Sequence, residues 1–294
     1  MEVVMRKKIN IADILLVVII SLWALVIILP FLNVVVISFT TNKEYLMRPL
    51  LLIPHEPTLK NYMDLFEDGR IWVGYGTTLQ ILLFGLPVNL FLTTSFAYGL
   101  SRKRYPGRKL IFYLVLVTML FNGGIIPMYL LMMKLGLTDS LGSVVLAYGI
   151  NTFYMIIMRN FFSGLPDALI ESAKIDGAGE WTILLRIILP LSMPIIATIT
   201  LFYTVDRWNE WFNAMIFIKS PNLQPLQLVL RSIVLESQLL DKISAEGSVV
   251  IDQQRFANGM KMAAVMVTML PIMCVFPFLQ KHFAKGVLVG AIKS

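Results

Sequence analysis

The sequence predicts an all-α membrane protein with six transmembrane helices, on three observations. The chain of 294 residues is 57% hydrophobic and only 15% charged, whereas about 25% of the residues in a soluble domain are charged. Its apolar residues form continuous runs of membrane length, since a helix needs about 20 of them to cross the hydrocarbon core. Continuous runs disfavour a β-barrel, whose strands alternate apolar and polar residues. Basic residues also gather between alternate runs, as they do on the cytoplasmic side of membrane proteins.

Each apolar run is expected to be a helix, because backbone polar groups cannot stay unpaired in lipid. The first run follows Arg6, Lys7 and Lys8 and is too long for the apolar region of a signal peptide, so we expect an uncleaved anchor. The six expected spans are 12–38, 77–100, 110–133, 141–162, 191–217 and 259–280.

The order of the spans predicts a small N-terminal part and a larger core. Residues 1–76 are expected to hold the anchor helix and an outer loop. Residues 77–294 are expected to form a core domain of five transmembrane helices. Two long connections belong to this core, the loop 163–190 on one side of the membrane and the outer loop 218–258 on the other.

The orientation follows from the short connection 101–109, which holds five basic residues. Short loops rich in Lys and Arg lie on the cytoplasmic side, so this connection is expected to be cytoplasmic. Both termini and the loop 163–190 then share that side. The net charge of +7 is explained by this topology and by the anionic lipid of the inner leaflet, and it gives no reason to expect nucleic-acid binding.

The chain lacks the residues that common catalytic chemistry requires. Cys274 is the single cysteine, and His55 and His282 are far apart, so neither a disulfide within the chain nor a metal site is expected. The phosphate-binding pattern G-x-x-x-x-G-K-[ST] and the nucleophile pattern G-x-S-x-G are both absent from the sequence. We therefore expect no catalytic residue and no cofactor in this chain.

The loop 163–190 differs from the other connections in its chemistry. Pro166 is suited to the start of a short amphipathic helix, and Asp-Gly at 176–177 is a turn signal because glycine enters left-handed conformations at little cost. A second short helix is expected from Glu180 to the residue before Pro190. The pattern predicts a helix–turn–helix whose small residues let another protein approach closely, although a merely solvated loop is the alternative.

The same loop carries the residues of a family motif. Glu171-Ser172-Ala173 is followed after three residues by Gly177, and after nine more by Ile187-Ile188-Leu189-Pro190. This spacing resembles the EAA motif of binding-protein-dependent ABC importer permeases, with Ser172 in place of the first alanine. The wider sequence resembles carbohydrate importer permeases of the maltose-transporter group, specifically the lipoprotein/polysaccharide-type branch. The stretches that carry this wider resemblance are 121–140, 158–178, 208–218, 225–233 and 270–294.

The resemblance implies the ABC type I importer permease fold and a heteromeric machine in the bacterial inner membrane. Its other components would be a second, different permease subunit, two ABC ATPase subunits that bind ATP and Mg, and an extracytoplasmic solute-binding protein that delivers a sugar. The outer segments would help to receive that protein. The loop 163–190 would be the cytoplasmic coupling loop, with its contact to the ATPase made by Glu171, Ser172, Ala173, Asp176, Gly177 and Ala178.

The substrate path is less readable from the sequence. Charges within a membrane span mark a functional or interior position, and Arg207 and Glu210 are spaced to pair on one helix face. The neighbouring tryptophans and amides either face the pore, where they would suit sugar hydroxyls and apolar sugar faces, or form an interfacial belt. The candidate residues for the path are Asn209, Trp211, Asn213, Tyr129 and Asn122.

Two other functions are kept as alternatives. The chain could serve an ABC importer for another polar solute, such as a peptide, because the sequence does not identify the sugar. A secondary transporter would show inverted repeats and coupling charges at mid-membrane, and it would have no use for a coupling loop.

Overall fold

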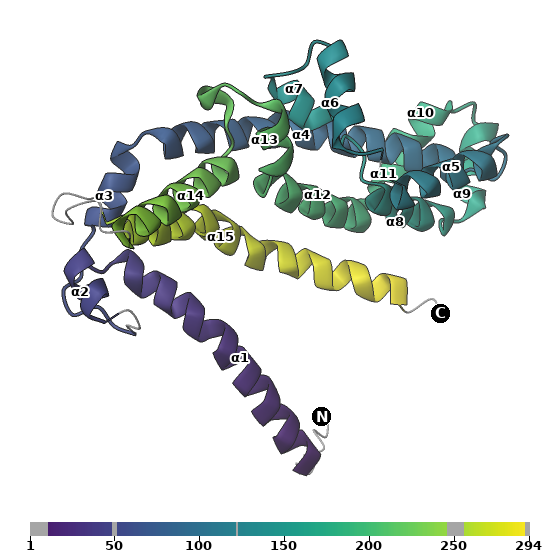
Figure 1. Ribbon diagram of the computed structural model, residues 1–294. Coiled ribbons are helices and arrows are strands. Elements are labelled where there is room, and N and C mark those ends of the chain that lie inside the picture. The colour runs from purple at the N-terminus through teal and green to yellow at the C-terminus, as the bar shows by residue number, and fades with distance from the viewer. Residues whose placement is uncertain (1–10, 49–51, 122, 246–255, 292–294) are drawn as a thin grey trace. The chain divides into compact units, whose positions relative to one another are not determined.

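The structure, a computed structural model, describes residues 11–48, 52–121, 123–245 and 256–291. Every regular element within these ranges is a helix (Figure 1). The chain divides into two compact units, one drawn from Met1–Asp68 with Ile233–Val267 and one from Gly69–Ser232 with Thr268–Ser294. The division into residues 1–76 and 77–294 stays a prediction.

The first unit begins with a long apolar helix, α1, that matches the first expected span. α1 contains Pro30 without a break, and its side chains are exposed along most of its length, as expected of a surface that meets lipid or another subunit. Its C-terminal end is fixed by Asn61, whose Nδ2 donates to the carbonyl oxygens of Ser38 and Thr40, both at 3.0 Å. The helices are α1 (Ile11–Ser38), α2 (Asn42–Met47) and α3 (Lys60–Glu67).

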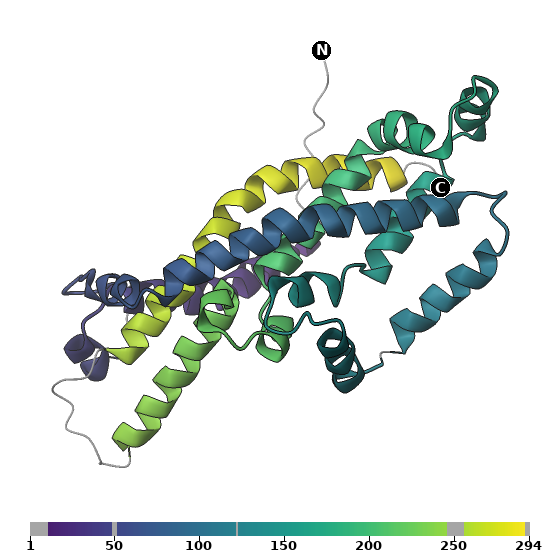
Figure 2. The ribbon, with the colours of Figure 1, turned by 90° about the horizontal axis from the view of Figure 1, so that it is seen from above.

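The second unit is built around the longest helix that lies wholly within it, α4. α8 and α12 pack against α4, which is the long blue helix in Figure 2. Two further helices, α14 and α15, contribute residues to both units. The helices are α4 (Arg70–Ser101), α5 (Arg108–Leu120), α6 (Ile125–Lys134), α7 (Leu141–Leu146), α8 (Thr152–Ser163), α9 (Asp167–Ile175), α10 (Glu180–Ile183), η1 (Leu184–Ile188, a π-helix), α11 (Leu189–Leu191), α12 (Met193–Trp208), α13 (Phe212–Phe217), η2 (Pro221–Leu223, a 3₁₀-helix), α14 (Leu226–Ala245) and α15 (Ala257–Ala291).

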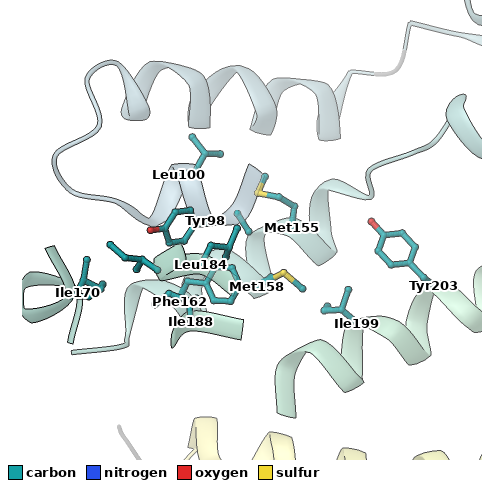
Figure 3. Close-up of a cluster of buried hydrophobic side chains, with 13 residues drawn as sticks. Tyr98, Leu100, Met155, Met158, Phe162, Ile170, Leu184, Ile188, Ile199 and Tyr203 are labelled. Atoms are coloured by element: carbon teal, nitrogen blue, oxygen red, sulfur yellow. The ribbon is translucent and has the colours of Figure 1, made fainter. Parts of the chain in front are cut away.

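The main apolar core of the second unit lies where α4, α8 and α12 meet (Figure 3). Met155, Met158 and Phe162 of α8 are almost completely buried in it. Ile170 and Ala173 of α9 belong to the same cluster. The short helices that follow α8 in sequence are therefore held against the long helices by side-chain packing.

Three described helices are long and apolar enough to cross a membrane, and two bent helix pairs raise the number to five. The expectation of six spans is thus not confirmed among the residues that the structure describes. The three are Ile11–Ser38, Arg70–Ser101 and Ala257–Val275, and the bent pairs are Arg108–Leu120 with Ile125–Lys134 and Glu180–Leu191 with Met193–Trp208.

The expected span 191–217 differs from the structure in both its limits. The chain bends by 86° between Glu180–Leu191 and α12, and it breaks again after Trp208, before α13. The segment before the bend is wound as a π-helix, which is a common site of irregular helix geometry.

The expected span 141–162 is two short helices, α7 and α8, and a buried side chain explains the break. Arg207 donates hydrogen bonds to the carbonyl oxygens of Val144, Val145 and Tyr148 at 2.9–3.3 Å. Asn151 then starts α8 by accepting from two backbone N–H groups of its first turn. Carbonyls that would continue one helix are used by an arginine from another helix instead.

The connection 218–258, which the sequence predicts to be an outer loop, contains the whole of α14. Residues 246–255 of this loop lie outside the described residues. The start of the loop is fixed by Asp139, whose carboxylate accepts from the backbone N–H groups of Lys219 and Ser220, both at 2.8 Å, and from the Ser220 hydroxyl at 2.6 Å.

Candidate functional site

The turn after α9 is a helix C-terminus that requires glycine. Gly177 has a φ of +79°, in the left-handed region that other residues rarely adopt. Its N–H donates to the Lys174 carbonyl oxygen at 3.1 Å, and the Ala178 N–H donates to the Ala173 carbonyl oxygen at 2.9 Å. These two bonds form a Schellman motif, which satisfies carbonyls at the end of the helix and reverses the chain. We call α9, this turn and α10 (residues 167–183) the elbow.

The inner face of the elbow is tied to the end of α4. Glu180 accepts a hydrogen bond from Lys174 and another from the Tyr98 hydroxyl, both at 2.5 Å. These bonds, with Lys174 the larger cause, hold the pKa of the Glu180 carboxyl below its ordinary value. Lys103, just beyond α4, donates to Asp167 at 2.6 Å and lowers the pKa of that carboxyl in the same way.

The face of the elbow opposite this one is exposed and carries both apolar and charged side chains. Ile175 is 86% exposed, although it is a large apolar residue on a short helix. Glu171 is exposed beside it and meets Arg104 only at 4.0 Å, a distance at which an exposed pair contributes little. Such a surface can receive another protein, because an apolar residue and a loosely paired carboxylate are both available.

The predicted coupling residues divide between the two faces. Ala173 is buried in the core cluster, Ala178 packs at its edge, and the Ser172 hydroxyl donates back to the Ala168 carbonyl oxygen at 2.9 Å. Glu171, Asp176 and Gly177 remain on the exposed part of the elbow. The motif therefore combines residues that hold the elbow in place with residues that present its surface.

A cavity of about 740 Å³ lies between the elbow and the C-terminal end of α4. It is lined by four basic and three acidic side chains together with Trp181 and Leu184. In Figure 1, α9, α10 and the start of α5 are grouped at this end of α4. The charged lining residues are Arg102, Lys103, Arg104, Lys174, Asp167, Glu171 and Glu180.

A second cavity, of about 370 Å³, lies beyond the end of α12. Asn209, Trp211 and Asn213, which the sequence indicates as candidates, all line it. Asn151 and Asp206 line it as well. Amides, a carboxylate and aromatic rings around one cavity are the chemistry that a polar solute with apolar faces requires.

The floor of this second cavity is a buried charged network centred on Arg207. The Arg207 Nε donates to Asn89 Oδ1 at 3.0 Å, and Nη1 lies 3.5 Å from Glu210 Oε2, so the expected pair is confirmed. Arg207 is 4% exposed and Glu210 is 9% exposed. Glu210 in turn accepts from the Asn213 backbone and side-chain amides at 2.9–3.1 Å. The network fixes one wall of the cavity to α4 and α7.

Other candidates lie elsewhere or were missed by the sequence analysis. Tyr129 stacks on Phe217 with ring centroids 6.3 Å apart, in a separate apolar cluster, and does not line the second cavity. Asn122 lies outside the described residues. Asn89, a fully buried amide within a long apolar helix, is not among the sequence candidates, although a polar residue inside a membrane span is a signal of a functional or interior position.

Among the residues that the structure describes, no group of three or more His, Cys, Asp or Glu side chains is placed to hold a metal ion.

Long apolar helices with a polar cavity among them are typical of helical membrane transport proteins. Residues 96–289 match the family described as binding-protein-dependent transport system inner membrane component, and the chain belongs to this family.

The relatives and a solved structure support the same assignment. The chain is 42% identical to Protein LplC of Bacillus subtilis (strain 168), over 91% of this chain and 90% of that protein. It is 40% identical to the polygalacturonan/rhamnogalacturonan transport system permease protein YtcP of the same organism, over 93% and 95%. It also resembles a chain in the crystal structure of a bacterial ABC transporter involved in the import of the acidic polysaccharide alginate, with a TM-score of 0.83, 26% identity and coverage of 94% and 98%. The chain thus has the fold of an ABC importer permease.

Proposed function

We propose that this chain is a permease subunit of an ATP-driven importer that takes up a carbohydrate, chiefly an oligosaccharide. The observation that carries the proposal is the likeness, over more than nine-tenths of both chains, to a permease named for polygalacturonan and rhamnogalacturonan. A permease named for arabinooligosaccharides, 27% identical over 92% of this chain, points to the same class of solute.

The partners follow from the family. A second, different permease subunit completes the membrane path, two ABC ATPase subunits bind ATP and Mg and supply the work, and an extracytoplasmic solute-binding protein delivers the sugar. This chain hydrolyses no ATP in this scheme, since its sequence lacks a phosphate-binding loop. Both termini and the elbow lie on the cytoplasmic side, and the outer loop 218–258 faces the solute-binding protein.

The elbow is the coupling device in this proposal. Exposed Ile175 and Glu171 dock on the ATPase, while the buried residues of α9 join that docked surface to the core cluster of α4, α8 and α12. A closing movement of the ATPases is then passed to the long helices as a rigid-body displacement. Gly177 holds the angle between the docked helix and the rest of the chain.

The second cavity is part of the solute path. Asn209 and Trp211 are both exposed and contribute an amide and an aromatic ring to it, and the guanidinium group of Arg231 lies over the Trp211 ring, 4.5 Å from its centroid. The side-chain amide of Asn213 donates hydrogen bonds to Glu210 and forms part of the cavity wall. The side chains of the second permease subunit complete the site.

The test is uptake by the complete transporter in proteoliposomes with ATP and Mg on the ATPase side. We expect radiolabelled oligosaccharides to accumulate only when the solute-binding protein is present. A panel of pectic, arabinan and neutral glucan oligosaccharides, with a peptide pool as the control, identifies the solute class. Uptake of peptides with none of the sugars would contradict the proposal.

A further inference from the structure

The cavity beside the elbow contains an arginine whose hydrogen-bonding capacity is not used. Lys103 is paired with Asp167 at 2.6 Å and Lys174 with Glu180 at 2.5 Å. Among the residues that the structure describes, Arg102 has no such carboxylate partner, and its Nε and Nη2 atoms are buried without a hydrogen bond. Leaving a buried donor without a hydrogen-bond partner is unfavourable, and more so when the donor is charged.

The two unused atoms form one edge of the guanidinium group. Nε–H and Nη2–H point in parallel from that edge, and this is the fork that binds the two oxygens of a phosphate or carboxylate. The flat face of the same group lies over the Tyr98 ring, 4.4 Å from its centroid. Arg102 lines the cavity, so a rotation of its side chain turns this edge toward the space within.

The other walls of the cavity resemble the boundary between membrane and water. Trp181 lines the cavity, is exposed, and stacks in parallel on Phe91 of α4 with centroids 6.3 Å apart. Phe91 is exposed as well. Exposed aromatic rings are typical of the level of the lipid headgroups. A cationic fork beside such rings fits an amphipathic anion better than a soluble one.

We propose that this cavity binds the phosphate group of an anionic phospholipid from the cytoplasmic leaflet, with Arg102 as the main contact. The four basic side chains of the lining exceed its three acidic ones, so the cavity as a whole also favours an anion. Basic pockets between transmembrane helices on the cytoplasmic side recognise anionic headgroups. The inference rests on the cytoplasmic placement of the elbow in the proposed function.

A lipid bound here would touch both the end of α4 and the elbow. The phosphate lies against Arg102, which follows α4 directly, and the apolar part of the lipid lies against Trp181 and Leu184, where α10 leads into η1. The lipid therefore stiffens the joint through which the elbow moves the long helices.

The test measures lipid retention by the complete transporter, with no sugar and no nucleotide present. The complex is placed in nanodiscs of phosphatidylcholine containing phosphatidylglycerol, released into detergent, and its retained phosphatidylglycerol is counted by native mass spectrometry. We expect wild type to retain at least one molecule per copy of this chain. We expect Arg102→Gln to retain at least fivefold less, and Arg102→Lys to be intermediate, because lysine keeps the charge and loses the fork.

The matched control is Lys109→Gln, which removes the same charge at an exposed position in the first turn of α5, outside the cavity lining. It should retain as much lipid as wild type. Added glycerol 3-phosphate at millimolar concentration distinguishes a lipid headgroup from a free phosphate ester as the ligand. If phosphatidylglycerol is still retained, the lipid proposal is supported. If it is fully displaced, the proposal is overturned and the ligand is a free phosphate ester.

Two further results would overturn the proposal. Equal retention by wild type and Arg102→Gln would show that the lipid binds elsewhere. If the Arg102→Gln complex loses a partner subunit while its lipid retention is unchanged, Arg102 binds a carboxylate of that subunit and not a lipid. Because the count needs no transport, its failure is distinguishable from a failure of the proposed sugar uptake.

Discussion

The two ends of the second unit use charged residues in opposite ways. Around Arg207, the charges are buried and each donor has a fixed partner on another helix. Around the elbow, the ion pairs are largely exposed, one of them is only loosely closed at 4.0 Å, and Arg102 keeps unused donors.

The network around Arg207 therefore has a structural role, whereas the elbow presents a surface that can bind another molecule. Breaking a buried charge pair costs about 3–5 kcal/mol, because an unpaired charge is left inside the protein. An exposed pair contributes only about 0–1 kcal/mol and can exchange partners at little cost. We therefore expect substitutions near Arg207 to affect folding, and substitutions near the elbow to affect coupling while the complex stays assembled.

The largest effect is expected for Arg207→Met. It leaves Glu210 buried without its cation, and it removes the donors that satisfy three carbonyl oxygens, so stability should fall by about 3–5 kcal/mol. The measurement is the thermal transition of the purified complex in detergent. Arg186→Met, at an exposed position of η1, is the control and should change stability by less than about 0.5 kcal/mol. Equal stability of both variants would contradict a structural role for the network.

The next effect distinguishes two glycines that are two residues apart. Gly177 and Gly179 both have open space around them, but only Gly177 has a positive φ. Alanine at Gly177 costs about 1–2 kcal/mol in that conformation, a roughly five- to thirty-fold shift in the equilibrium of the turn. We expect Gly177→Ala to reduce uptake by that order and Gly179→Ala to leave it nearly unchanged. Equal uptake by the two variants would show that the left-handed turn at Gly177 does not contribute to transport.

A smaller, more selective effect is expected at the second cavity. Trp211→Ala removes an aromatic face, so the half-saturation concentration for the delivered sugar should rise about tenfold, equal to roughly 1.4 kcal/mol, while assembly is retained. Trp72→Ala, at another exposed tryptophan outside this lining, is the control. If both variants lower only the amount of protein in the membrane, the interfacial-belt interpretation of Trp211 is correct.

The smallest effect concerns pH at the elbow. The pKa of Glu180 is lowered in the folded protein, so its stabilising contribution is complete above the ordinary carboxyl pKa and is lost as the pH falls through the lowered value. As the pH is lowered from neutral through the ordinary carboxyl pKa and below it, we expect the midpoint of thermal unfolding of wild type to fall more steeply than that of Glu180→Gln. Parallel pH profiles would show that the bonds from Lys174 and Tyr98 contribute nothing.

The parts of the fold that depend on local sequence were predictable. The turn at Gly177 follows from Asp-Gly, and the pairing of Arg207 with Glu210 follows from their spacing of three residues, although Glu210 lies just beyond the end of α12. Both features involve residues only a few positions apart.

The parts that depend on distant contacts were not predictable. The break between α7 and α8 arises because Arg207, about 60 residues further on, takes the carbonyl oxygens of residues 144–148. The cavity beside the elbow likewise combines residues 95–106 with residues 167–184, so no single stretch of sequence indicates it.

The central claim, that work enters this chain through the elbow, is tested most directly by cross-linking. In a Cys274→Ser background, Ile175→Cys places a thiol on the exposed face of α9, and Met63→Cys places one on α3, in the proposed outer segment. With a short thiol-to-amine reagent and the complete transporter, we expect Ile175→Cys to cross-link to an ATPase subunit and Met63→Cys not to do so. An ATPase cross-link from Met63→Cys, with none from Ile175→Cys, would contradict the account.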